Sequence, residues 1–226
     1  IYSFPWVENF GFTASDPFPP MNWTMHSGVL ANPTVLGKHP SGHWVKDDWL
    51  NNTAIPNKAA KIYMALVNNG WLITPPVMIP EEGYELSFDL ALMAYNSANP
   101  PQQSGTDDIF TVLIGDGTSW TPANIVRQWD NQGSEYVYNQ IPNTGMKVTI
   151  PLNEPGLIQI AFYGISTIYN AANDLMIDNV TIIKSTNCLP PTNLLVSNIS
   201  SSSADISWMA GSDETLWNIK YGALGF

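Results

Sequence analysis

Trp71-Leu72-Ile73-Thr74-Pro75-Pro76 and the run that follows it, Tyr84-Glu85-Leu86-Ser87-Phe88-Asp89-Leu90, decide the fold. The two prolines interrupt regular pairing because proline has no backbone N–H to donate. From Tyr84 onward, apolar and polar residues alternate, so an extended chain has one apolar and one polar face. A half-buried antiparallel strand has this pattern. The run therefore predicts a β-sandwich.

The rest of residues 1–185 contains similar short segments separated by turns. The expected strands lie at 1–11, 23–30, 58–67, 84–92, 109–114, 124–129, 135–139, 146–152, 157–164 and 175–183. Segment 58–67 also fits a short helix, but strands surround it and we expect a strand. Short strands with a turn about every ten residues are typical of an all-β antiparallel sandwich of the jelly-roll type.

Four motifs in the right order resemble one family. They are the run above, "ENFGF…PFPPMNW" at Glu8–Trp23, "DDIFTVLIGDGTSW" at Asp107–Trp120 and "LMIDNVTI" at Leu175–Ile182. They resemble MAM-like sandwiches, in particular the cleaved-adhesin or choice-of-anchor J domains of secreted proteins in Bacteroidetes-type bacteria. The resemblance covers 1–185. The family usually has an acidic residue before the tryptophan of "WLITPP", whereas this chain has Gly70.

A second resemblance begins after a linker at 186–191. The segment "PPTNLLVSNISSSSADISWMA…TLWNIKYG" is similar to the first part of a fibronectin type III module. Its three expected strands contain Leu194 and Val196, then Ala204, Ile206 and Trp208, then Trp217, Ile219 and Tyr221. A complete sandwich of this class needs about 100 residues. We therefore expect 192–226 to be a partial module.

Composition excludes some partners. The chain has 19 acidic and 8 basic residues, a net charge of −11, and Arg127 as its only arginine. Nucleic-acid binding needs clustered Lys and Arg, which this sequence lacks. No apolar run is long enough to span a membrane, so we expect no membrane insertion. Cys188 is the only cysteine, so no disulfide can form within the chain.

Three acidic residues lie in apolar surroundings. Asp108 and Asp178 share the alternation of their apolar neighbours, and Glu8 lies within the apolar first strand. Burying a carboxylate costs on the order of several kcal/mol unless it is paired or bound to metal. First and last strands of jelly rolls commonly lie side by side, so Glu8 and Asp178 could meet. Calcium binds about 6–8 oxygens, and the resemblance also implies a structural calcium.

We therefore expect a calcium site, with Asp48 and Asp89 as reserve ligands. The alternative is that each carboxylate caps a turn or accepts backbone N–H groups. A zinc site at His39 and His43 is disfavoured because Pro40 and Gly42 prevent the helix that would align them. Adjacent acidic residues, such as those at 81–82 and 107–108, could serve a glycosidase, but the sequence does not give their separation.

Aromatic residues are the other candidate binding groups. Trp44, Trp120, Trp129 and Tyr169 lie in or beside loops rich in amide and acidic side chains, and such rings can stack on sugars. The alternative is that they cover the ends of the sandwich core.

These features predict a non-catalytic adhesion or recognition module of a secreted or bacterial cell-surface protein, with glycans, cell-surface proteins and neighbouring domains as partners. The rival functions are a carbohydrate-binding module of a glycan-degrading enzyme and a structural spacer beside a secreted peptidase.

Overall fold

The structure is a computed structural model that describes residues 3–11, 13, 15–30, 37–38, 44–65, 68–185, 191–210, 217, 219 and 222. The chain divides into two compact units, Ile1–Lys184 and Ser185–Phe226. His39, His43 and Cys188 lie outside the described residues. The zinc alternative at His39 and His43 therefore falls outside the described part of the chain.

The first unit is an all-β sandwich, as predicted. Sheet A contains β12 (Met146–Leu152), β8 (Tyr84–Ala94), β14 (Asn173–Lys184), β5 (Lys58–Met64) and β4 (Trp44–Asp48) in this order, with β1 (Trp6–Glu8) paired to β14. All of these pairings are antiparallel. Residues 58–64 of the expected segment 58–67 therefore form a strand, in which Ala60, Ile62 and Met64 point into the core and β14 and β4 pair on either side.

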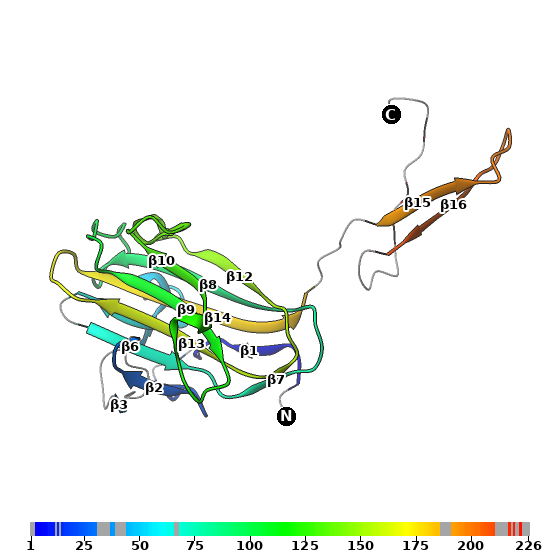
Figure 1. Cartoon of the computed structure of the whole chain (residues 1–226). Helices are drawn as coiled ribbons and strands as arrows, with labels where there is room; N and C mark the ends of the chain where they lie inside the picture. The colour runs from blue at the N-terminus through cyan, green and yellow to red at the C-terminus, as the bar shows by residue number, and fades with distance from the viewer. Residues whose placement is uncertain are drawn as a thin grey trace. The chain divides into compact units, whose positions relative to one another are not determined.

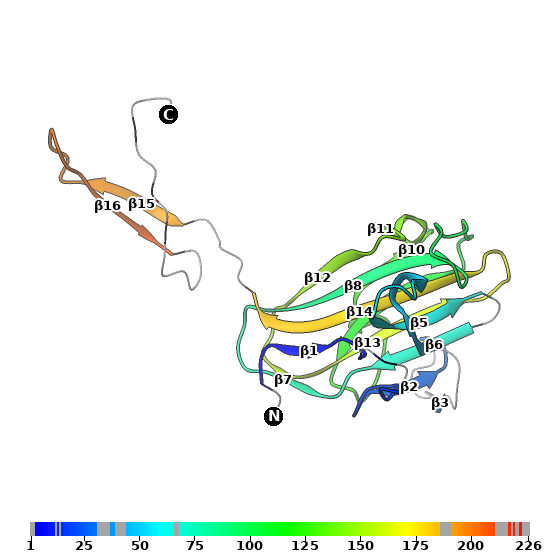
Figure 2. The same cartoon turned by 180° about the vertical axis from the view of Figure 1, so that it is seen from behind.

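Sheet B lies across from sheet A (Figures 1 and 2). Its order is β11 (Tyr136–Val137), β10 (Ile125–Asp130), β9 (Ile109–Gly115), β13 (Gly156–Ser166), β6 (Asn68–Ile73), β2 (Thr24–Ser27) and β3 (Gly37–Lys38), with β7 (Val77–Ile79) also paired to β13. Among the described strand pairs of this sheet, the short β10–β11 pair alone is parallel. Three short 3₁₀ turns complete the described elements: η1 (Trp49–Asn51), η2 (Pro122–Asn124) and η3 (Tyr138–Gln140).

The core between the sheets is rich in aromatic rings. The ring of Trp23 lies between those of Trp6 and Phe162, with centroid distances of 5.9 and 6.4 Å. Phe162 in turn meets Phe88 edge-on at 5.2 Å. Such pairs contribute about 0.5–1.5 kcal/mol each beyond the area that they bury. The loop before β2 is thereby fixed to both sheets.

A bulge in β14 corrects the predicted direction of Asp178. Asp178 lies opposite Asp89, and Ile177 opposite Leu90, before the register shifts at Asn179, which has a φ of 50°. Residues directly opposite on neighbouring strands share a face. Asp178 therefore belongs to the outer face of sheet A. It is nevertheless fully buried, and its carboxylate accepts a hydrogen bond from Asn57, in the segment between η1 and β5.

The second unit contains one antiparallel hairpin, β15 (Thr192–Ser197) with β16 (Asp205–Met209). β15 contains Leu194 and Val196 of the first expected strand, and β16 contains Ile206 and Trp208 of the second, whereas Ala204 precedes β16. Trp217 and Ile219, which were expected on a third strand, lie outside any strand, and Tyr221 is not among the described residues. The ring of Trp217 packs edge-on against Trp208 at 5.4 Å. Assignment to the fibronectin type III class stays a prediction.

Candidate functional site

Three of the four predicted sugar-stacking residues are core residues. Trp44, Trp120 and Trp129 are buried, with at most 2% of their surface exposed. The indole N–H of Trp44 donates to the Gly70 carbonyl at 3.1 Å. Trp120 packs on Trp71 against the outer face of sheet B.

Trp129 lies opposite Phe110 in the β9–β10 register, and their ring centroids are 5.3 Å apart. The prediction that these three rings could contact a ligand is therefore wrong. The alternative that they close the sandwich core describes Trp44 and Trp129, while Trp120 covers a second apolar cluster.

The fourth residue, Tyr169, belongs to an exposed group of rings. It lies in the loop between β13 and β14 and is 68% exposed, and Tyr95, just after β8, is 51% exposed. The ring of Tyr95 lies 4.7 Å from that of Tyr63, which is half-buried on β5. Partial burial raises the pKa of the Tyr63 phenol, as do Tyr169 and Tyr95 nearby. Tyr63, Tyr95 and Tyr169 are called the tyrosine cluster below.

Asp107 anchors the loop that carries Tyr169. One carboxylate oxygen, Oδ2, accepts the backbone N–H groups of Thr167 at 3.1 Å and Ile168 at 3.0 Å, and the other accepts the side-chain amide of Asn170. Burial works against the charge of Asp107, but these donors outweigh it and lower the pKa of the carboxyl. The loop is therefore held by bonds to an ionised carboxylate, which are stronger than neutral hydrogen bonds.

Asp174 anchors the turn that carries Tyr95. Asp174 is fully buried on β14, opposite Tyr63 on β5, and its Oδ2 accepts the backbone N–H of Asn96 at 2.8 Å. The same oxygen lies 3.4 Å from Lys61 Nζ. Tyr95 itself donates its backbone N–H to the Ala172 carbonyl at 3.0 Å, which ties the two tyrosine-bearing loops together.

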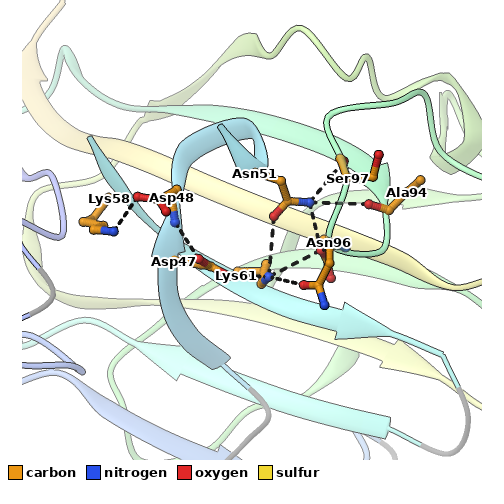
Figure 3. A network of polar contacts seen from close by, with 9 residues as sticks. Asp47, Asp48, Asn51, Lys58, Lys61, Ala94, Asn96 and Ser97 are labelled. Carbon is orange, nitrogen blue, oxygen red and sulfur yellow. Dashed lines mark hydrogen bonds and ion pairs between the residues drawn. The ribbon is translucent and has the colours of Figure 1, made fainter. Parts of the chain in front are cut away.

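Lys61 is the cation of this network, which Figure 3 shows around its ammonium group. Lys61 also forms an ion pair with Asp47 and donates to Asn96 Oδ1 at 3.2 Å. Burial disfavours the charge of Asp47, but the contact with Lys61 outweighs it and lowers the pKa of this carboxyl. The loops that carry Tyr95 and Tyr169 are thus held by a network of hydrogen bonds and ion pairs, and they are not independent of each other.

The acidic residues predicted as metal ligands separate into different places. Glu8, Asp89 and Asp178 lie near one another, because the first two both raise the pKa of the Asp178 carboxyl. Burial is the main cause, and the pKa reaches about 7 although Asn179 and Asn57 donate to the carboxylate at 2.7 and 2.6 Å.

Glu8 accepts the Phe10 backbone N–H at 2.6 Å, yet burial still raises the pKa of its carboxyl. Asp89 has a cation of its own, since Lys147 Nζ lies 3.2 Å from its Oδ1. Among the acidic residues at this end of β14, Glu8 and Asp178 therefore have the negative charges that nearby groups balance least.

The other two predicted ligands lie elsewhere. Asp48 forms an ion pair with Lys58. Asp108 is fully buried, as its alternation predicted, but it faces Tyr138 and the hydroxyls of Ser104 and Ser166. Those hydroxyls donate to other acceptors, so neither carboxylate oxygen of Asp108 has a hydrogen-bond partner. Burial raises its pKa to about 6.

The five predicted ligands therefore do not form one site. Among the described residues, no three or more His, Cys, Asp and Glu side chains are grouped so that they could hold a metal ion. A calcium at the Glu8–Asp178 pair would have to complete its shell with backbone carbonyls, amide oxygens and water, which calcium accepts.

Comparison with solved structures shows the fold. The K1 cleaved adhesin domain of Lys-gingipain from Porphyromonas gingivalis is 15% identical, with a TM-score of 0.50, and the match covers 81% of this chain and 99% of that one. The K3 domain of the same protein is 15% identical over 79% and 96%, with a TM-score of 0.43. At such identities the K1 match establishes a cleaved-adhesin-like fold and nothing further.

A carbohydrate-binding module of class CBM61, solved with β-1,4-galactotriose, is 12% identical over 81% of this chain and 100% of that one, with a TM-score of 0.45. This likeness is too distant for an argument about ligands. No protein-family model and no curated protein matches the chain. In the part of the chain that the structure describes, no helix has the length and apolar character needed to cross a membrane.

Sequence reasoning missed Tyr63 and Tyr95. The alternation of β5 places Tyr63 with Lys61 on the polar face, which was a usable signal. Tyr95 is the first residue after β8, at the start of a loop rich in amide side chains and proline. Their meeting depends on the strand order β8–β14–β5, which no local pattern supplies.

Proposed function

We propose that this chain is a non-catalytic recognition module of a secreted or cell-surface protein, and that the tyrosine cluster is its ligand-contacting surface. One observation carries the proposal. Two exposed tyrosines, Tyr95 and Tyr169, lie on loops that Asp174 and Asp107 anchor, beside the half-buried Tyr63 of β5. An exposed ring normally has no need of such support, whereas a binding surface gains from being rigid before the ligand arrives.

Glycans are the ligand class that this surface fits best. A tyrosine ring offers an apolar face for the C–H groups of a sugar and a hydroxyl for its polar edge. Asn96 and Asn170, both exposed, flank the rings with amide groups that can donate and accept hydrogen bonds. A protein on a cell surface is the second candidate, because tyrosines also dominate protein interfaces.

The non-catalytic part of the proposal rests on what the paired acidic residues already do. Asp107 uses both oxygens to hold a loop, and Asp108 is enclosed away from solvent. Glu81 binds Lys184 at 2.8 Å. A glycosidase needs two carboxyl groups that face the same sugar across a few ångströms. Asp107 and Glu81 instead bind other groups of the chain, and Asp108 does not reach solvent.

A glycan array with the whole chain tests the proposal. We expect binding to one group of related glycans and a loss of about tenfold or more in affinity for Tyr95→Ala and Tyr169→Ala, since central aromatic contacts carry most of the binding energy. Leu157→Ala is the control, because Leu157 is also exposed but lies on β13 outside the cluster. Absence of any ligand among glycans and cell-surface proteins would favour the spacer function instead.

We also propose that a calcium ion stabilises the first unit through Glu8 and Asp178. Support comes from the chemistry of the pair: a fully buried carboxyl, a second one beside it, and, within the described part of the chain, amide groups as the hydrogen-bond donors to Asp178. A divalent cation would balance charge that these donors do not neutralise. Its role would be to fix β1, which pairs with β14 in sheet A, and the segment at Asn57 to the part of β14 around Asp178.

A further inference from the structure

Next to the tyrosine cluster, the structure brings together a buried lysine amine, a buried aspartate and the carboxamide of the partly buried Asn51. The side chain of Lys61 is 7% exposed and that of Asp174 is 0% exposed. Lys61 Nζ lies 3.5 Å from Asn51 Oδ1. Asp174 Oδ2 lies 2.9 Å from Asn51 Nδ2 and 3.4 Å from Lys61 Nζ. One carboxylate therefore contacts both the amine and the amide nitrogen.

We propose that Lys61 and Asn51 join spontaneously in an intramolecular amide bond, with Asp174 as the proton-transfer group. The Lys61 ammonium first passes a proton to Asp174. The neutral amine then attacks Cγ of Asn51, and the bond from Cγ to Nδ2 breaks. A second proton moves from the amine to Nδ2, which leaves as ammonia. The products are a secondary amide, a protonated Asp174 and one ammonia, so atoms and charge balance without an oxidant or a co-reactant.

The contacts of Asp174 suit this proton transfer. A general base or acid must lie within hydrogen-bond reach of the atoms that exchange the proton. Its Oδ2 meets that condition for Asn51 Nδ2 and comes close to it for Lys61 Nζ. Its other oxygen, Oδ1, is buried and has no hydrogen-bond partner, so it is free to hold the proton that the reaction leaves behind. The neutral acid then needs no buried cation.

The backbone holds Asn51 in place for the attack. Leu50 and Asn51 have φ values of 59° and 50°, in the left-handed region that residues other than glycine rarely occupy. Such backbone is strained and persists where the surroundings enforce it. Asn51 Nδ2 also donates to the carbonyls of Ala94 and Ser97, at 3.4 and 3.2 Å. Fixing both reactants in this way replaces a bimolecular encounter by a unimolecular step.

Asn51 is a better partner than Asn96. Asn96 Oδ1 lies nearer to Lys61 Nζ, at 3.2 Å, but Asn96 is exposed, and Asp174 contacts its backbone N–H rather than its side-chain amide. A departing amide nitrogen needs a proton donor beside it, and the structure provides one only at Asn51 among these two. Asp47, which also contacts Nζ, gives the amine a second carboxylate that can accept its proton.

The bond would fasten η1 to β5 on the outer face of sheet A. That location is two residues from Tyr63 on β5 and adjoins the turn of Tyr95, where Asn51 Nδ2 contacts the Ala94 carbonyl, so the covalent link would stiffen the base of the tyrosine cluster. The inference does not depend on what the cluster binds, and its test does not require a ligand.

Intact-mass spectrometry of the denatured, full-length chain tests the bond. The expected mass is that of the sequence less one ammonia. Trypsin should then yield one branched species that joins fragment 47–58 to fragment 59–127, because an acylated Lys61 is no longer cleaved. A mass equal to that of the sequence would overturn the proposal, as would a link from Lys61 to Asn96.

Two controls separate this bond from other losses of ammonia. An asparagine succinimide has the same mass but is opened by mild alkali or hydroxylamine, whereas the amide should survive. Lys61→Arg keeps a cation and should show the full sequence mass. Asp174→Asn should also show the full mass if Asp174 transfers the proton; a linked Asp174→Asn protein would contradict that role.

Discussion

Strand β14 carries two buried aspartates four positions apart, and their surroundings differ. Asp174 faces the amine of Lys61 together with the amides of Asn51 and Asn96. Asp178 receives hydrogen bonds from amide groups and lies beside Glu8 and Asp89, which raise its pKa further. Equal burial thus has two solutions. At Asp174 the chain supplies a cation, Lys61, whereas Asp178 is met by amide donors, and it is there that we propose a calcium ion.

The largest effect should come from calcium at the Asp178 end. A ligand that binds only the native state stabilises it by about 4 kcal/mol at a thousandfold excess over its dissociation constant. Thermal melting with calcium and with a chelator should therefore differ by roughly 8–16 °C for a unit of this size. Asp178→Asn should remove the difference, and Asp48→Asn should keep it. Coincident melting curves with calcium and chelator would end the calcium proposal.

The next effect concerns Asp108, at the Asp174 end of the sandwich. Its folded pKa of about 6 lies above the unfolded value near 3.8. The native state therefore binds this proton more tightly. The stabilisation is complete below about pH 4 and is lost as the pH rises through about 6, by on the order of 3 kcal/mol.

Asp108→Asn has no such titration. The difference in unfolding free energy between wild type and variant, measured by urea denaturation, should move in favour of the variant between pH 4 and pH 7. A difference that stays constant over this range would show that Asp108 has the same pKa in both states.

A smaller effect is expected at Asp107, which holds the Tyr169 loop. Asp107→Ala removes the acceptor of the Thr167 and Ile168 N–H groups and should cost about 1–3 kcal/mol in unfolding free energy. Hydrogen exchange should increase at 167–170, and the cluster should bind its ligand more weakly. The matched variant is Asp116→Ala, because Asp116 also accepts a backbone N–H but lies in the exposed turn after β9.

The smallest effect on stability should be that of Tyr169→Ala. An exposed side chain outside the core changes the unfolding free energy by about 0.5 kcal/mol or less. Its binding affinity should nevertheless fall about tenfold, as argued above. A large loss of stability with unchanged binding would assign Tyr169 to structure and remove it from the ligand surface.

The strands could be predicted from the sequence because alternation is a local property. Segment 146–152 was predicted with the bounds that β12 has, and β8 extends two residues beyond its predicted end at 92. The burial of Asp108 also followed from its place in the alternation. Each of these predictions requires only the alternation of residues between the two faces of a single strand.

The errors arise where two strands or a loop and a sheet determine the outcome. The bulge at Asn179 reverses the alternation of β14, so Asp178 was predicted on the wrong face. Trp129 was predicted at the end of a strand, beside a loop, as a residue that could stack on a sugar, but its register opposite Phe110 puts it in the core. The tyrosine cluster combines residues from β5, the end of β8 and the β13–β14 loop, and proximity of that kind is visible only in three dimensions.

Ligand contact with the tyrosine cluster can be observed by NMR, with the aromatic signals of the nine tyrosines followed while the strongest glycan from the array is added. We expect saturable shifts at Tyr63, Tyr95 and Tyr169, and unchanged signals at Tyr84 and Tyr138, which are buried in the core. Saturable shifts confined to residues outside the cluster would contradict this contact.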